Sequence, residues 1–277
     1  AETVLHEFPG IIEAPNWLND GNTLLYNADG KIYRYEIDKD HVEQVDTGFC
    51  VQCNNDHVPS PDNQLLAVSC MPPELTDGTY ESHIYVLPMT GGEPKDLTGP
   101  GLSYLHGWSP DGKELAYCAF RKKPEEETMR IEICTIPSDG GEETCLTDGK
   151  GYNDGPEYSP DGKHIWFNST RSGLMQVWRM NRDGSGLTQM TDFDANNWFG
   201  HVSPDGKHVI YLTFAKGELE PNEHLPNMHV SLGMMDYDGQ NKKKLLDLFG
   251  GQGSINVNSW APDSRRIAYV KYVLHHK

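Results

Sequence analysis

A four-residue phrase, Ser-Pro-Asp-Gly, recurs along this chain and constrains its fold more than any other feature. It occupies residues 109–112, 159–162 and 203–206, and looser copies begin at residues 18, 60 and 261. Successive copies are 42, 49, 50, 44 and 58 residues apart, a spacing typical of repeat proteins. The sequence therefore predicts six similar structural units.

Each unit has the pattern of a small antiparallel sheet. In the phrase itself, proline presets its own φ, aspartate can accept backbone hydrogen bonds and glycine tolerates a positive φ, so the phrase is a tight turn. Apolar segments such as Leu65 to Ser69 and Ile84 to Leu87 follow it, then a Gly-rich hairpin turn and a short fourth segment. Four strands in 40 to 50 residues describe one blade of a propeller.

We therefore expect an all-β fold in which residues 1–277 form one domain, a six-bladed β-propeller of four-stranded antiparallel blades. The 28 glycines and 18 prolines suit many short strands joined by turns. The sixth unit ends soon after Ile267 to Val270 and is one strand short. Because an open sheet edge leaves backbone groups unpaired, we expect Thr3 to Phe8 to pair there and close the ring.

The fullest copy of the repeat, residues 106–113, reads His-Gly-Trp-Ser-Pro-Asp-Gly-Lys and resembles the WD40-like (PD40) repeat of TolB-like propellers. The resemblance extends over nearly the whole chain and implies a six-bladed propeller. It does not imply one activity, because such repeats occur in translocation proteins, peptidase domains and sugar lyases.

Charge excludes one class of partner and hydropathy excludes one kind of location. A formal net charge of −18 repels phosphate backbones, so we expect no nucleic-acid partner. No apolar run approaches the roughly 18 residues of a membrane helix, so we expect a soluble chain without membrane insertion. A cytoplasmic location is favoured over a periplasmic one, with removal of an export signal before Ala1 as the alternative.

The six cysteines are expected to be free thiols. Cys70, Cys118 and Cys134 fall in apolar strand segments and are interpreted as small buried hydrophobes. Cys50 and Cys53 have the spacing of half a zinc site or of a redox pair, but no second pair accompanies them.

Polar side chains cluster just before the innermost strands of the predicted blades, where they would meet at one end of the central channel. Singly, such residues often only satisfy turn backbone, but together they indicate a site. The candidate ligand-binding residues are Glu13, Asn55, Asp56, His57, His106, Asn153, Asp154, His201, Gln252 and Asn256.

Three functions remain open. The first is binding of a small polar ligand, such as a carbohydrate, or of a protein segment at this channel mouth. The second is a metal-dependent carbohydrate lyase or related sugar enzyme, in which His57, His106 and His201 would hold a divalent metal ion. Oligogalacturonate lyases of the TolB-like group use a histidine and glutamine cluster for this purpose, whereas here Ile255 and Val257 follow Gln252. The third is a protein-interaction scaffold that uses the long loops at 71–81, 121–128 and 216–227.

Overall fold

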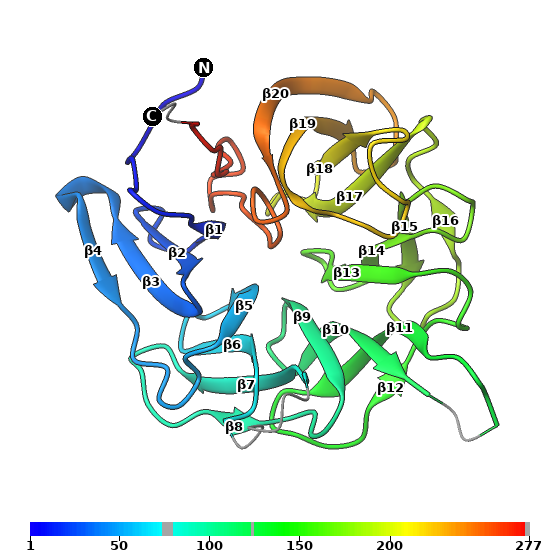
Figure 1. Ribbon diagram of the computed structural model, residues 1–277, viewed down its shortest axis with the longest axis horizontal. Helices are drawn as coiled ribbons and strands as arrows, with labels where there is room; N and C mark the ends of the chain where they lie inside the picture. Colours follow the sequence, from blue (N-terminus) through cyan, green and yellow to red (C-terminus); the bar gives the residue numbers. More distant parts are fainter. Residues whose placement is uncertain (74–79, 123–124, 275–277) are drawn as a thin grey trace.

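Five four-stranded antiparallel sheets surround a central axis in the computed structural model, which describes residues 1–73, 80–122 and 125–274 (Figure 1). Within each sheet the strands follow chain order, and the first strand lies nearest the axis. The strands are β1 (Glu13–Trp17), β2 (Thr23–Ala28), β3 (Lys31–Glu36), β4 (His41–Gln44), β5 (Cys53–Pro59), β6 (Leu65–Cys70), β7 (His83–Pro88), β8 (Lys95–Asp96), β9 (Leu102–Trp108), β10 (Glu114–Arg121), β11 (Arg130–Pro137), β12 (Thr144–Cys145), β13 (Asn153–Tyr158), β14 (His164–Ser169), β15 (Gln176–Asn181), β16 (Thr188–Gln189), β17 (Ala195–Val202), β18 (His208–Ala215), β19 (Pro226–Asp236) and β20 (Lys243–Gly251).

The prediction of six blades is wrong, because the sixth repeat does not form a sheet among the described residues. Residues 254–274 make one antiparallel bridge, Trp260 to Ile267, and lie between the sheet of β17–β20 and β1 (Figure 1). Trp260 packs in the core of the β17–β20 sheet, while Ala261 and Ala268 pack with Trp17 of β1. The described residues after this hairpin, 271–274, form no further strand, and the repeat bridges its two neighbours.

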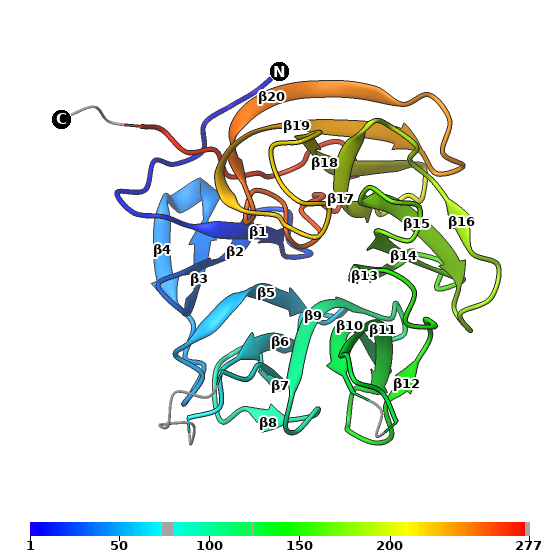
Figure 2. The ribbon, with the colours of Figure 1, turned by 45° about the vertical axis from the view of Figure 1, so that its right-hand side comes forward.

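The predicted closure by Thr3 to Phe8 is also wrong. This segment forms no strand and lies on the β1–β4 sheet, where the ring of Phe8 is 4.9 Å from that of Tyr26. The Tyr35 hydroxyl donates a hydrogen bond to the Leu5 carbonyl at 3.0 Å. Aromatic packing therefore holds this segment on the β1–β4 sheet, and its backbone does not pair with Ile267 to Val270. Segments near the two ends of the chain still lie close together (Figure 1, Figure 2). Lys271 Nζ lies 2.5 Å from Glu2 Oε1 in an ion pair.

The turn phrases adopt the predicted chemistry. In the copy at residues 159–162, the Ser159 hydroxyl donates to Asp161 Oδ1 at 2.7 Å and accepts the His164 N–H at 3.0 Å. Gly162 donates its N–H to the Ser159 carbonyl at 2.8 Å and has a φ of +69°. Gly112 and Gly206 have the same φ. The phrase is thus a self-contained turn between the first and second strands of a blade.

A disulfide joins Cys134 of β11 to Cys145 of β12, so the prediction of six free thiols is wrong. The two cysteines are register partners on neighbouring strands of one blade, a pairing that an argument about distances between blades misses. Cys50, Cys53, Cys70 and Cys118 are free and buried.

Every innermost strand, β1, β5, β9, β13 and β17, contains a β-bulge, and the bulges differ. In three strands the irregular pairing contains a residue with positive φ four positions before the turn phrase: Ala14, Gly155 and Phe199. In β9 the extra residue is His106 itself, because Gly107 pairs with Ala116 and Leu105 with Tyr117. A bulge re-aims the side chains around it, so these differences decide which polar residues reach the channel.

Helix is confined, in the part of the chain that the structure describes, to one 3-10 turn at Ile37–Lys39, and none there could cross a membrane. Two of the long loops named above lie partly outside the described residues, at 74–79 and 123–124.

Candidate functional site

A cavity of about 630 Å³ opens at one end of the channel. Four innermost strands contribute to its lining, together with residue 224 before β19 and the start of the sixth repeat. The sequence-predicted residues that line it are Glu13, Asn55, Asp56, His106, Asp154, Gln252 and Asn256.

His106 occupies the centre of the polar groups in this cavity. Its Nε2 lies 3.2 Å from Asp154 Oδ1 and 3.9 Å from Asp56 Oδ1. Burial lowers the pKa of His106, but the two carboxylates outweigh it, so the net direction is upward. The bulge in β9 places this imidazole between the carboxylates from β5 and β13.

Asp154 is held as a carboxylate by two histidines. His224 Nε2 lies 3.5 Å from Asp154 Oδ2, whereas His106 approaches Oδ1, and the Gly155 N–H donates to Asp154 Oδ1 at 2.7 Å. Burial opposes ionisation, but the hydrogen bonds from His106 and His224 hold the pKa of Asp154 well below its usual range. Its negative charge is therefore balanced within the site.

Asp56 differs from Asp154 in the direction of its pKa shift. Its side chain accepts hydrogen bonds from Asn256 Nδ2 at 2.5 Å and from Asn54 Nδ2 at 2.6 Å. Burial raises the pKa of Asp56 to about 6, helped by the charge of Asp154 and opposed by His106. Two aspartates in one cavity thus have pKa values shifted in opposite directions, a pattern that clusters at functional sites.

Glu13 extends the acidic side of the cavity toward β1. Burial and the nearby Asp56 raise the pKa of Glu13, while a hydrogen bond from Asn55 opposes the shift. Asn55 Oδ1 also accepts from Asn256 Nδ2 at 3.1 Å. Glu13, Asn55, Asn256 and Asp56 therefore form one connected polar cluster, which we call the acid–amide cluster.

His57 does not reach the cavity. Its ring is fully buried, and neither nitrogen makes a hydrogen bond of normal geometry. Three residues of β5, 54 to 56, oppose a single residue of β6 between the pairs Cys53–Cys70 and His57–Val68. After this bulge Asp56 lines the cavity and His57 lies inside the structure, where burial lowers the pKa of His57 to about 4.

His201 belongs to a separate buried network. Its Nδ1 lies 2.6 Å from Glu157 Oε2, and its Nε2 lies 2.5 Å from the Ile255 carbonyl oxygen. The ring of Phe199 stacks on His106 at 6.1 Å and on His201 at 6.5 Å, so an aromatic ring separates the two histidines. The Glu157 network also binds Asn258 at 2.7 Å and fastens the sixth repeat to β13 and β17.

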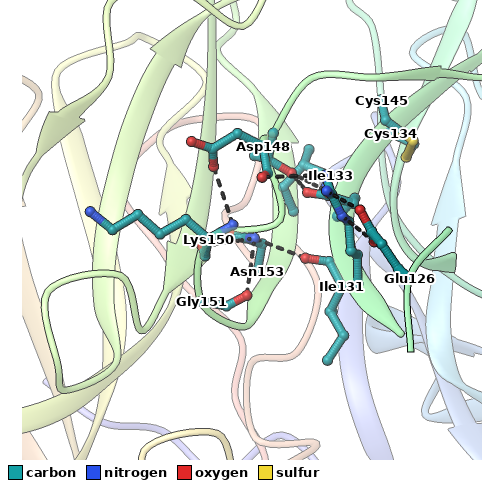
Figure 3. A network of polar contacts seen from close by, with 12 residues as sticks. Glu126, Ile131, Ile133, Cys134, Cys145, Asp148, Lys150, Gly151 and Asn153 are labelled. Carbon is teal, nitrogen blue, oxygen red and sulfur yellow. Dashed lines mark hydrogen bonds and ion pairs between the residues drawn. A yellow bond between two sulfur atoms is a disulfide. The ribbon is translucent and has the colours of Figure 1, made fainter. Parts of the chain in front are cut away.

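Asn153 is likewise a structural residue at this place in the fold. Its Nδ2 donates to the Ile131 carbonyl of β11 at 2.8 Å (Figure 3). Its Oδ1 accepts from the Ser169 hydroxyl at 2.8 Å and from Arg171 Nη2 at 3.1 Å. The amide is therefore fully used between neighbouring strands.

The three histidines predicted as metal ligands do not fit a shared ion, because only His106 lines the cavity. Among the described residues, the only group of three or more acidic, imidazole or thiol side chains with ligand atoms within 4.8 Å of one another is Cys134, Glu143 and Cys145. That group lies elsewhere, and two of its members are joined in the disulfide.

Sequence reasoning missed the aromatic side of the cavity. Tyr104, Phe120 and Tyr152 line it, with Tyr104 to Phe120 at 5.8 Å and Phe120 to Tyr152 at 6.2 Å, both edge to face. The period of two along a strand offered a signal for Tyr104, which precedes His106 by two residues. It offered none for His224, which lies in a loop before β19.

A ring of four-stranded antiparallel sheets around a central axis defines the β-propeller class of folds. The family model of the TolB β-propeller domain matches residues 81–227. An uncharacterized protein of Agrobacterium fabrum is 44% identical over 270 residues, which cover 97% of this chain and 87% of that protein. The chain therefore belongs to the TolB β-propeller family.

Solved structures agree with this membership. A candidate TolB of Agrobacterium tumefaciens has a TM-score of 0.90 and 44% identity, and the match covers 99% of this chain and 94% of that one. TolB of Acinetobacter baumannii has a TM-score of 0.69 at 21% identity, covering 88% of this chain and 56% of that one. An oligogalacturonate lyase in complex with manganese has a TM-score of 0.55 at 14% identity, covering 86% and 66%. The last two likenesses concern the fold alone.

Proposed function

We propose that this protein binds a small polar ligand in the cavity at the end of its channel. The observation that carries the proposal is the acid–amide cluster, because it lines a cavity of ligand size and contains a buried hydrogen-bonding atom without a partner. Asn256 is 2% exposed, and its Oδ1 has no partner while its Nδ2 donates twice. A buried acceptor left unpaired costs stability, so the cluster still lacks one hydrogen-bond donor.

Binding without chemistry is favoured over the metal-dependent lyase. The lyase hypothesis depended on three histidines around one ion, and two of them, His57 and His201, lie outside the cavity. The long loops at 71–81, 121–128 and 216–227 could serve a protein-interaction scaffold, but no contact among their described residues favours that hypothesis.

Saturation-transfer NMR of the full chain against a set of neutral, cationic and anionic polar compounds tests the proposal. Ala28 ends β2 and lines the cavity, so Ala28→Trp fills space without removing a polar group. Ala215 ends β18 at an exposed position away from the cavity, so Ala215→Trp is the matched control. We expect bound compounds to be lost from the first variant and kept by the second. Compounds that survive Ala28→Trp, or an absence of binding to the unmodified chain, would contradict the proposal.

A further inference from the structure

The charges around the cavity are not balanced. Its described lining contains the carboxylates of Glu13, Asp56, Asp154 and the exposed Asp29 but no lysine or arginine, and its only basic side chains are two histidines. Both histidines approach Asp154, and His106 also lies 3.9 Å from Asp56, so these two imidazoles face four carboxylates. Ionised Glu13 and Asp56 would therefore attract a positively charged group and repel an anionic one.

The unpaired Asn256 Oδ1 gives the second, independent indication. Because both hydrogens of its Nδ2 are engaged by Asn55 and Asp56, the amide is fixed with its oxygen as the free group. A free acceptor beside two carboxylates suits a ligand group that offers several N–H donors. An ammonium or a guanidinium group meets this requirement and a hydroxyl with its single donor does not.

The aromatic residues suit the same kind of ligand. Tyr104, Phe120 and Tyr152 form a continuous edge-to-face series that lines the cavity. Aromatic faces attract cations and pack on alkyl chains, whereas they give an anion no favourable contact.

A metal ion is a poorer match than an organic cation. Among the cavity residues that the structure describes, no three carboxylate or imidazole donor atoms lie within 4.8 Å of one another. Acceptors spread over several blades fit a larger group that spans them.

We propose that the ligand is an organic cation whose ammonium or guanidinium group is bound by Glu13, Asp56 and Asn256, with its carbon skeleton against Tyr104 and Tyr152. This inference rests on the binding function proposed above and specifies the chemical class of the ligand. It also implies that the cavity discriminates against uronates and other acidic sugars.

Isothermal titration calorimetry of the full chain with 1,5-diaminopentane and with its neutral counterpart 1,5-pentanediol tests the inference. We expect the diamine to bind at least about tenfold more tightly, as charged hydrogen bonds of about 1.4 kcal/mol would give. Binding of the diamine should weaken from pH 7.5 to pH 5, because the pKa values of Asp56 and Glu13 are raised, so these carboxylates take up protons, while His106, whose pKa is also raised, gains charge. Asp154 stays ionised over this range and does not contribute to the change.

Glu13→Gln keeps the shape of the side chain and removes its charge, so it should weaken binding of the diamine about tenfold. Glu218→Gln makes the same change in net charge at an exposed position outside the cavity lining and should leave binding unchanged. Should Glu13→Gln fail to fold, the comparison of diamine with diol on the unmodified chain still decides. Equal affinity for the two compounds, or tighter binding of galacturonate than of diamine, would overturn the inference. If the chain showed either of these outcomes and Ala28→Trp still abolished the binding, the inference about a cation would fail but the proposed binding function would stand.

Discussion

Replacement of Asp56 by asparagine should stabilise this protein at neutral pH, although it removes a buried and hydrogen-bonded side chain. The pKa of Asp56 is raised from 3.8 to about 6, and burial is the main cause. The folded state therefore binds a proton more tightly than the unfolded state does. Ionisation of Asp56 destabilises the fold increasingly as pH rises from about 4 to about 6, and the full penalty applies above that range.

The structure gives the size of this effect. The difference between the two pKa values corresponds to about 3 kcal/mol of unfolding free energy at pH 7. Asparagine offers only one acceptor oxygen to Asn256 and Asn54, so one hydrogen bond, worth about 1 kcal/mol, is lost. We expect Asp56→Asn to be more stable than the unmodified protein by about 2 kcal/mol at pH 7.5, and the gain should vanish by about pH 4.

Urea unfolding followed by tryptophan fluorescence between pH 4 and pH 7.5 measures this difference. Asp154→Asn is the matched control, because the pKa of Asp154 is lowered by its two histidine partners. Loss of the Asp154 carboxylate should lower the free energy of unfolding by about 3 kcal/mol, as for other broken buried ion pairs. A variant Asp56→Asn that is less stable at every pH, or equally stabilised at all of them, would refute the assignment of Asp56 as a carboxylate strained by burial.

Three further predictions concern the scaffold. Trp260→Ala should lower the free energy of unfolding, measured by calorimetry, by about 3–5 kcal/mol. Trp260→Phe should lose only the hydrogen bond from Nε1 to the His201 carbonyl, about 1 kcal/mol. Equal effects would mean that packing of the sixth repeat does not stabilise the ring. Thiol titration of denatured protein should find four reactive groups without reductant and six after reduction, and six without reductant would exclude the bond between Cys134 and Cys145. Ser159→Ala should cost about 1–2 kcal/mol in urea unfolding, since the Ser159 hydroxyl bonds Asp161 and the His164 backbone; no loss would show that Pro160 and Gly162 suffice for the turn.

The disulfide was within reach of the sequence. Cys134 lies five residues before Asp139 and Cys145 five residues after Gly140, the two residues at the centre of the hairpin between β11 and β12. Residues equidistant from a hairpin turn face each other across the pair of strands, so the spacing alone indicated a contact. A comparison of cysteines between blades could not detect a bond within one blade.

The repeated turn phrase determined the architecture by itself. Proline, aspartate and glycine fix a tight turn through local geometry and short-range hydrogen bonds, so Ser159 to Gly162 could be interpreted without knowledge of the rest of the chain. The spacing of these turns then set the number of strands in each blade. The same local logic counted one blade too many, because a turn phrase at Ala261 does not supply the further strands that a sheet needs.

Only the tertiary structure decided which polar residues meet. Asp56, His106 and Asp154 all precede a turn phrase, but at offsets of four, three and five residues. They converge because each innermost strand carries a different bulge, and a shift of one residue turns a strand side chain to the opposite face. As a result, the side chains of His57 and His201 do not line the cavity. Pairing with the next strand and packing against neighbouring blades set these bulges, and both involve residues far apart in the sequence, so the periodicity that predicts the blades cannot predict the contents of the cavity.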